Sequence, residues 1–234
     1  MEEVLLEVKS VSKKFEDRYV LENVDMRLEN CQFIAILGHS GSGKSTMLNI
    51  LSSVLRPSTG YVFYKGRDIT KLSKKEVAEI RREYIGLVFQ HYMLLPNLTI
   101  RENIEIGNKK DNKNINLEEL CTLLGIQHLL EHYPYQLSGG EQQRACIARA
   151  VIKKPEILFC DEATGALDSD NSKNIIILLH DIKKRYGTSI FFTTHNREIA
   201  KTADRIIILE DGHIVKDYMN IQILSPEQMK WEIS

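Results

Sequence analysis

The sequence lacks an excess of charge of either sign. Its 234 residues include 31 Lys and Arg against 32 Asp and Glu, which leaves a formal net charge of −1. A dedicated nucleic-acid-binding protein usually carries a strong basic excess. We therefore expect no nucleic acid among the partners of this protein, although the balance leaves room for a local basic patch.

Cysteine is scarce and is not arranged in pairs. The four cysteines, Cys31, Cys121, Cys146 and Cys160, are widely separated and form no CxxC motif, and three of them lie in apolar runs. Structural zinc sites usually need paired ligands, whereas an isolated apolar cysteine is an ordinary core residue. The pattern predicts a reduced, cytosolic chain without structural zinc.

Long apolar runs and internal repeats are also missing. No run approaches the ~18 residues that cross a bilayer, and the acidic start "MEEVLLEVKS" does not resemble a signal peptide. With 43% apolar and 27% charged residues, the composition is that of an ordinary soluble globular protein. We expect any membrane role to depend on a partner.

Short β-rich apolar runs are what the chain does contain, and they predict buried strands of a mostly parallel sheet. Four of them are "FIAIL" (33–37), "EILFC" (156–160), "SIFFTT" (189–194) and "RIIIL" (205–209). Segments with helical spacing lie between the runs, such as residues 171–186, which Gly187 closes. This alternation predicts an α/β fold.

Two regions depart from the alternation. The first part of the chain, with "VLLEVKSVSKKF", "YVLENVDMRL" and "GYVFYKG", has period two and predicts an antiparallel β-subdomain. Residues 97–154 contain several helical patterns and no strand-like run, which predicts a helical insertion. The polar stretch "NKKDNKNIN" (108–116) indicates an exposed loop.

These patterns together predict one domain over residues 1–234. We expect the core and the β-subdomain in residues 1–90 and 155–216, and a helical subdomain at about residues 91–154. A short tail, residues 217–234, has no task that the sequence assigns.

The segment "GHSGSGKST" matches the phosphate-binding pattern GxxxxGK[ST], and it lies between the run "FIAIL" and an apolar helical segment. In that setting glycines let backbone N–H groups curl around phosphate, and the helix N-terminus adds its dipole. We expect Lys44 to reach the terminal phosphates of a nucleoside triphosphate and the Ser45 hydroxyl to bind Mg²⁺. The residues predicted to bind the nucleotide are Gly38, His39, Ser40, Gly41, Ser42, Gly43, Lys44, Ser45 and Thr46.

Polar residues follow three other apolar runs. Asp161 and Glu162 end the strand in "ILFCDEATGALD", where Asp161 is suited to hold Mg²⁺ and Glu162 to activate a water molecule. Gln90 ends "IGLVFQ" and can bind Mg²⁺ or the attacking water. His195 follows "SIFFTT" and can donate a hydrogen bond to a γ-phosphate. Taken singly, Gln90 is an ordinary loop residue and His195 an ordinary structural histidine.

A second glycine-containing segment, "LSGGEQQR", begins at Leu137. Ser138 and Glu141 have the spacing of a capping box before an apolar helix. That role does not explain Gly139 and Gly140, because each glycine costs a helix up to about 1 kcal/mol relative to alanine. A helix start without side chains is also open to an incoming phosphate.

Taken in chain order, five features resemble the motifs of the ATP-binding cassette (ABC) ATPases along nearly the whole chain: the phosphate-binding loop, Gln90, "LSGGEQQR", "DEATGALD" and His195. The resemblance implies a P-loop NTPase core of RecA-like type, with ATP and Mg²⁺ as ligands. Cassettes of this family pack head to tail, so Ser138, Gly139 and Gly140 would complete the ATP site of a second copy. Asp168 in the "GALD" turn would cross that interface.

The resemblance also implies an aromatic residue that stacks on adenine. Phe15 in "SKKFEDRYV" corresponds best to it, and Tyr19 is the local alternative. Two positions depart from the family pattern. Ala163 stands where proline is usual and could loosen the turn that carries Glu162, and His39 is an atypical residue in a phosphate loop.

Within the family, "LSKKEVAEIRREYIGLVFQHYMLLPNLTIRENI" and "DEATGALDS" are similar to the macrolide-exporter and lipoprotein-release type. Ala166 disfavours the cell-division cassettes of this group. The resemblance implies a peripheral subunit at the cytoplasmic face of the membrane, bound to permease subunits and driving export, lipoprotein or peptide release, or mechanotransmission. "HYMLLPNLT" (91–99) is a candidate permease contact, or else simply packs the helical subdomain.

A different class of function is a soluble ABC ATPase that acts on ribosomes or DNA. Such proteins carry two cassettes in one chain or a long inserted coiled coil, and this sequence contains neither. A P-loop kinase of small molecules would leave "LSGGEQQR" unexplained. The transported or controlled molecule is not encoded in the motifs, so peptides, macrolides, lipoproteins and cell-wall signalling all stay open.

Overall fold

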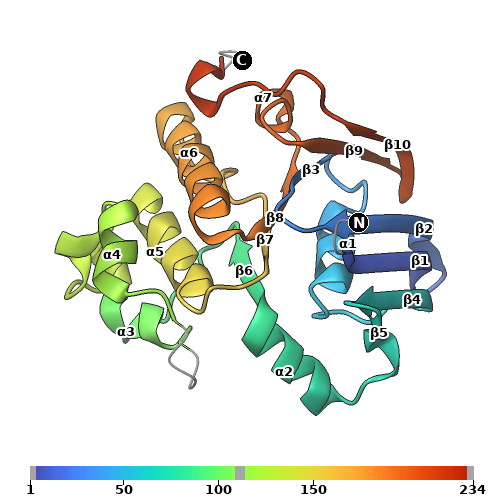
Figure 1. Ribbon diagram of the computed structural model, residues 1–234, viewed down its shortest axis with the longest axis horizontal. Helices are drawn as coiled ribbons and strands as arrows, with labels where there is room; N and C mark the ends of the chain where they lie inside the picture. The colour runs from blue at the N-terminus through green and yellow to red at the C-terminus, as the bar shows by residue number, and fades with distance from the viewer. Residues whose placement is uncertain (1–3, 109–113, 231–234) are drawn as a thin grey trace.

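The computed structural model describes residues 4–108 and 114–230. The middle of the predicted loop 108–116 and the last residues of the predicted tail lie outside these ranges. Figure 1 shows a central sheet, helices α3, α4 and α5 gathered on one side of it, and a second, antiparallel sheet with α1 on the other.

The central sheet has six strands in the order β10-β9-β3-β8-β7-β6. All neighbouring pairs are parallel except β10 with β9, which is an antiparallel pair at one edge. The four strands predicted from apolar runs are confirmed, two of them to the residue. Their bounds, with those of the remaining strands, are β3 Phe33–Leu37, β6 Ile85–Phe89, β7 Ile157–Asp161, β8 Ser189–Thr194, β9 Arg205–Glu210 and β10 His213–Met219.

Strand β3 shows why these runs have apolar residues at both odd and even positions. Successive side chains of a strand point to opposite faces of the sheet. Phe33 and Ala35 enter a core shared with the helices, whereas Ile34 and Ile36 enter a second core shared with α1 and the antiparallel sheet. A strand covered on both faces needs apolar residues at odd and even positions alike.

The antiparallel β-subdomain is confirmed as a four-stranded sheet in the order β2-β1-β4-β5. Its strands are β1 Val4–Phe15, β2 Arg18–Glu29, β4 Thr59–Tyr64 and β5 Arg67–Asp68. Leu6, Val8 and Leu28 are buried in the second core. This sheet therefore covers α1 from the side opposite the central sheet (Figure 1).

Helical residues dominate the insertion between β6 and β7. Of residues 97–108 and 114–154, which the structure describes, none is in a strand, as the sequence predicts. The helices of the chain are α1 Lys44–Leu51, α2 Lys74–Tyr84, α3 Ile100–Glu105, α4 Leu117–Leu123, α5 Gly139–Val151, α6 Ser169–Tyr186 and α7 Arg197–Ala200, with short 3₁₀ turns at Ile69–Lys71, Gln127–Leu129, Pro134–Gln136 and Pro226–Gln228. The α/β fold class is confirmed.

Within residues 4–108 and 114–230, no helix combines the length and apolar character that crossing a bilayer requires. All four cysteines are free, and Cys121, Cys146 and Cys160 are buried. Burial raises the pKa of Cys121 to about 11 and that of Cys146 to about 12, so these thiols stay protonated.

Candidate nucleotide site

The phosphate-binding loop of residues 38–46, or P-loop, joins β3 to α1 at the carboxyl edge of the central sheet. Gly41 and Gly43 have φ angles of 81° and 103°, a left-handed region that favours glycine. Gly38 needs its missing side chain for a different reason, since a Cβ there would lie 2.3 Å from the carbonyl oxygen of Leu209. The loop therefore keeps the tight backbone curve that the motif predicts.

Lys44 lies inside this curve and is only 4% exposed. Its Nζ donates hydrogen bonds of 2.9 Å to the carbonyl oxygens of both Gly38 and His39. The same Nζ lies 3.5 Å from Oε1 of Glu162. The Lys44 cation therefore lies at the first turn of α1. Both this cation and the helix dipole attract an anion such as phosphate.

Asp161 lies opposite Ser45, although the two residues are far apart in the sequence. Ser45 Oγ donates to Asp161 Oδ1 at 2.9 Å, and Thr193 Oγ1 donates to the same oxygen at 2.8 Å. The parallel register places Asp161 beside Thr193. Thr193 was not among the residues predicted from the sequence, because a threonine inside an apolar strand gives no signal of a functional partner.

Glu162 begins the turn after β7 with a φ of 44°, in the left-handed region. Its backbone N–H donates to Thr193 Oγ1 at 3.0 Å, and its Oε2 lies 3.9 Å from His195 Nδ1. The carboxylate therefore lies between Lys44 and His195. Ala163 is buried, and a hydrogen bond from Gly165 N to Glu162 O closes the turn without proline.

Gln90 follows β6, whose last residue pairs with Asp161 in the parallel register. Its Nε2 lies near Gly165, at 3.1 Å from the position a Cβ would take there. Within the described residues, no hydrogen bond joins Gln90 to Ser45 or Asp161. The fold brings Gln90 to the predicted edge of the sheet, beside the turn that carries the acids.

His39, the atypical residue of the loop, has an exposed side chain. Its Nδ1 lies 2.7 Å from the carbonyl oxygen of Ser40, and its Nε2 lies 3.6 Å from Asp211 Oδ1 in the β9–β10 turn. In the same turn, Gly212 N donates to Ser42 O. These contacts connect the P-loop to the β9–β10 turn at the edge of the central sheet.

The two aromatic candidates lie at the tip of the β1–β2 hairpin. Phe15 is 46% exposed and Tyr19 50% exposed, and each ring has a lysine Nζ over it, from Lys13 at 5.0 Å and Lys14 at 5.7 Å. Next to Tyr19, the Val20 carbonyl lies against the P-loop glycine Gly43. Both rings are therefore exposed on a hairpin that touches the P-loop.

The second glycine segment forms the start of α5. Ser138 is the N-cap residue, and its backbone N–H and hydroxyl donate to Glu141 Oε2 at 2.8 and 2.7 Å. A Cβ on Gly139 would lie 2.8 Å from Tyr92 Oη, and one on Gly140 would lie 2.6 Å from Asn171 Oδ1. Close packing against Tyr92 and Asn171 is thus a second explanation for glycine at positions 139 and 140, which the sequence did not reveal.

Asp168 lies beside this helix start as the N-cap of α6. It accepts hydrogen bonds from Asn171 N at 2.8 Å and from Asn171 Nδ2 at 2.7 Å, and these bonds lower the pKa of its carboxyl. Asn171 is also the residue against Gly140, so Asp168 and the start of α5 belong to one cluster. In the part of the chain that the structure describes, no hydrogen bond or ion pair joins Ser138 or Asp168 to the P-loop.

The comparisons with known proteins agree with this arrangement. Residues 21–165 match the family model described as "ABC transporter". Over 97% of its length the chain is 38% identical to the macrolide export ATP-binding/permease protein MacB of Vibrio parahaemolyticus, of which it covers 36%. Over 88% of its length it is 38% identical to the bacitracin export ATP-binding protein BceA of Halalkalibacterium halodurans, of which it covers 83%.

Solved structures show the same likeness. The dimeric structure of MJ0796, described as a bacterial ABC transporter cassette, superposes with a TM-score of 0.84 at 35% identity and covers 92% of this chain and 98% of that one. The chain belongs to the ABC transporter family and is an ATP-binding ATPase cassette. It spans about half, or less, of the length of several curated relatives, MacB among them.

Proposed function

We propose that this cassette hydrolyses ATP as one half of a head-to-tail pair of copies. The observation that carries the proposal is the contact network at the edge of the central sheet, where Lys44, Ser45, Asp161, Glu162 and His195 meet. The chain would act as one domain over residues 1–234, with residues 91–154 as its helical subdomain.

The residues around Asp161 fit Mg²⁺. Ser45 Oγ and Asp161 Oδ1 are hard oxygen ligands that already lie 2.9 Å apart, and Mg²⁺ is often bound by one or two carboxylates together with phosphate oxygens. Ser45, Asp161 and Gln90 would hold the ion. When bound, Mg²⁺ would neutralise charge on the β- and γ-phosphates.

Glu162 is the proposed general base. Its carboxylate lies between the cation of Lys44 and the ring of His195, so it can accept a proton from water close to the groups that face the γ-phosphate. Lys44 would stabilise the negative charge of the transferred phosphoryl group, and His195 would donate a hydrogen bond to it. Thr193 would hold both acids in position through its hydroxyl.

A second copy would supply Ser138, Gly139 and Gly140 to the same phosphates. Within one chain this cluster is bonded to Glu141 and packed against Asn171 rather than against the P-loop. Asp168, in the same cluster, would then lie at the interface between the copies. The similar cassette MJ0796 was solved as a dimer, which supports this arrangement. Phe15, or Tyr19 beside it, would stack on the adenine.

A permease is the proposed membrane partner, which would place the cassette at the cytoplasmic face of the membrane. The relative MacB is named as an ATP-binding/permease protein, and the chain covers about a third of it. Met93 and Leu95 in the segment 91–99 are 59% and 47% exposed and are candidates for this contact. The same segment also packs inward, because Arg149 donates to the carbonyl oxygens of Tyr92 and Met93.

The substitution Glu162→Gln tests the proposed base. It removes the proton acceptor and keeps the shape, so we expect turnover to fall by about 100-fold or more while ATP binding persists. Size-exclusion chromatography with ATP should then show a stable dimer. An active variant, or one that stays monomeric with ATP, would contradict the assignment of Glu162. Glu156→Gln, at a carboxylate that pairs with Lys65 elsewhere in the fold, is the control.

The membrane partner is tested by extracting native membranes with detergent and purifying the cassette. Recovery of an integral membrane protein in a fixed ratio to the cassette is the expected result. Recovery of ribosomal or DNA-bound complexes instead would favour a soluble ABC ATPase.

A further inference from the structure

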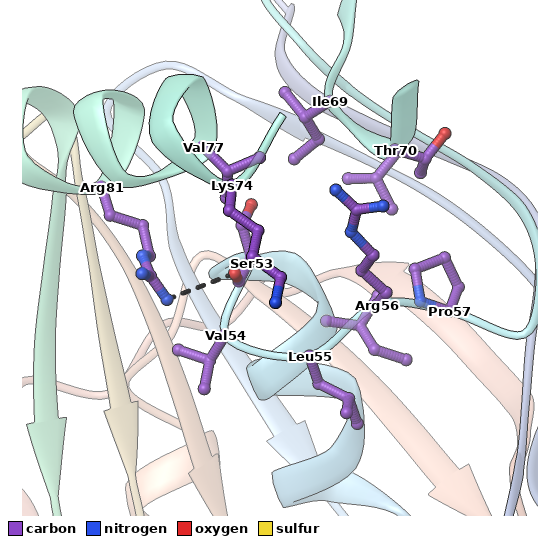
Figure 2. Close-up of a pocket in the computed structure, with 12 residues that line it drawn as sticks. Ser53, Val54, Leu55, Arg56, Pro57, Ile69, Thr70, Lys74, Val77 and Arg81 are labelled. Carbon is purple, nitrogen blue, oxygen red and sulfur yellow. Dashed lines mark hydrogen bonds between the residues drawn. The ribbon is translucent and has the colours of Figure 1, made fainter. Parts of the chain in front are cut away.

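A cavity of about 290 Å³ lies away from the nucleotide site, between the turn after α1 and the helix α2. Its lining comes from Ile50, from residues 53–57, from Val62 on β4, from Ile69 and Thr70, and from one face of α2. Figure 2 shows Val77 and Lys74 of α2 on one side of it and Leu55 and Arg56 on the other. The proposed mechanism makes no use of this cavity.

Three cationic side chains line this cavity, namely Arg56, Lys74 and Arg81, and no carboxylate is among the lining residues. Arg56 Nη2 donates to the Leu72 carbonyl oxygen at 2.6 Å, and Arg81 Nη1 lies 3.4 Å from the Ser53 carbonyl oxygen. Over residues 4–108 and 114–230, none of the three cations forms an ion pair with an acidic side chain. The cavity therefore holds positive charge that the chain does not neutralise.

Two nearby cations outside the cavity, Arg67 and Lys71, are paired with carboxylates. Arg67 lies 2.8 Å from Glu76, and Lys71 lies 3.1 Å from Asp68. Carboxylates are thus available nearby, but they pair with cations outside the cavity. Because unpaired cations that share one small volume repel each other, an anion placed among them would gain from all three.

The remaining walls are apolar. Ile50, Val62 and Ile69 are buried residues of the second core that reach the cavity. At the edge, Val54 is 47% exposed. Ser53 Oγ is shielded from solvent and, among the described residues, has no hydrogen-bond partner. Cations and apolar walls together favour a carboxylate beside an apolar group.

We propose that this cavity anchors an acidic and apolar segment of a partner protein, by a Glu or Asp side chain that enters beside a bulky apolar one. The volume lies near the lower limit of ligand pockets and suits one or two side chains rather than a large ligand. The exposed Val54 beside the cations matches the mixed rim and apolar centre of protein interfaces. The inference does not depend on ATP hydrolysis, which is measured separately.

The test measures binding of a short fluorescein-labelled peptide that carries glutamates beside leucines, and of the same peptide with glutamine in place of every glutamate. Fluorescence anisotropy with the full chain should show binding of the acidic peptide at least about tenfold tighter than that of the glutamine peptide. The preference should shrink as salt is added, because the cations are partly exposed.

Lys74→Gln is the main variant, since Lys74 makes no hydrogen bond or ion pair among the described residues and its loss should leave the fold intact. We expect it to weaken binding of the acidic peptide about fivefold or more, with ATP hydrolysis unchanged. Arg56→Gln should act in the same direction. Lys75→Gln, on the neighbouring exposed position of α2, is the matched control and should bind like the parent chain.

Equal binding of the two peptides, or binding of neither, would overturn the proposal. So would an equal loss of affinity in Lys74→Gln and Lys75→Gln, because that result would report general attraction to a basic surface. Octanoate provides the last arm. If octanoate displaces the acidic peptide and binds as tightly as that peptide does, the cavity is a site for small organic anions. That result would contradict the proposal of a partner-protein segment.

Discussion

The two glycine-rich helix starts, at α1 and at α5, solve different physical problems. The α1 start has Gly43 as its N-cap residue with a φ of 103°, and no side chain of that residue accepts a hydrogen bond from the first N–H groups of the helix. The α5 start has Ser138 as its N-cap residue, bonded to Glu141. Its glycines, Gly139 and Gly140, have no positive φ and instead make room for Tyr92 and Asn171.

The difference teaches that a glycine pair in a motif does not by itself reveal its cause. In the P-loop the positive φ angles favour glycine, whereas in α5 the side-chain ends of Tyr92 and Asn171 lie where a Cβ would be. The first cause is local and the second is tertiary. Both leave a helix N-terminus without bulky side chains, which is the feature that a phosphate can use.

The largest expected effect comes from mixing two variants, one with a changed α1 start and the other with a changed α5 start. Lys44→Ala removes the phosphate cation and Ser138→Arg blocks the α5 start, so each variant alone should lose turnover by about 100-fold or more. If the two starts act across a dimer, an equal mixture should recover about a quarter of the parent turnover, because half of the dimers are mixed and each mixed dimer has one complete site.

The control for this experiment mixes Lys44→Ala with the double variant Lys44→Ala/Ser138→Arg. Those dimers contain no intact P-loop and should stay inactive. If the first mixture also stays inactive although it forms dimers, the α5 start does not complete a partner's site.

Gly43→Ala tests the conformational cause. An alanine at a φ of 103° is strained, and its Cβ would lie 2.7 Å from the Val20 carbonyl oxygen, so we expect the free energy of unfolding to fall by about 3 kcal/mol. Gly66→Ala has a similar positive φ of 75° with no atom within 4 Å of its Cβ, and should cost only about 1 kcal/mol. Urea denaturation measures both, and equal losses would show that the close approach to Val20 is unimportant.

Gly140→Ala tests the packing cause, with a smaller effect of about 1 to 2 kcal/mol, because the contact is with the end of the Asn171 side chain. In an Asn171→Ala background that contact is gone, and the same substitution should instead stabilise the chain by up to about 1 kcal/mol through helix propensity. A cost that is the same in both backgrounds would disprove the packing explanation.

The smallest expected effect concerns the cap of α5. Hydrogen bonds from the side chain and backbone of Ser138 lower the pKa of Glu141 from its ordinary value of 4.5. A carboxyl with a lowered folded-state pKa adds stability above its ordinary value, and that stability is lost as the pH falls through the lowered value. Ser138→Ala should therefore cost about 1 kcal/mol near neutral pH and less in acid. A cost that does not change between about pH 6 and about pH 3 would contradict this linkage.

Much of the fold was readable from local pattern. The runs at 33–37 and 189–194 coincide with β3 and β8 because a strand buried on both faces is mostly apolar at odd and even positions alike. The apolar segment after the P-loop runs on to residue 55, but the helix ends at Leu51, because Ser53 with a φ of 60° leaves the right-handed helical conformation.

Some residues of the candidate site were also predictable from the sequence, and others were not. The P-loop residues, the acid pair and the α5 start follow from motifs, because each needs particular residue types at a particular spacing. Thr193 could not be predicted, since only the register of β7 against β8 brings its hydroxyl to Asp161 and to the N–H of Glu162. The three cations of the cavity beside α2 were equally hidden, because they come from two separate segments.

The sequence by itself determined the fold class, the family and the residues that can bind a phosphate, because these depend on short-range patterns of glycine, charge and apolar residues. Only the tertiary structure decided which neighbour each of those residues has. The end of the Asn171 side chain lies where a Cβ on Gly140 would be, and Asp161 faces Ser45 because the end of β7 meets the start of α1 at one edge of the sheet. Such contacts join residues that are distant in the chain, and no local pattern encodes them.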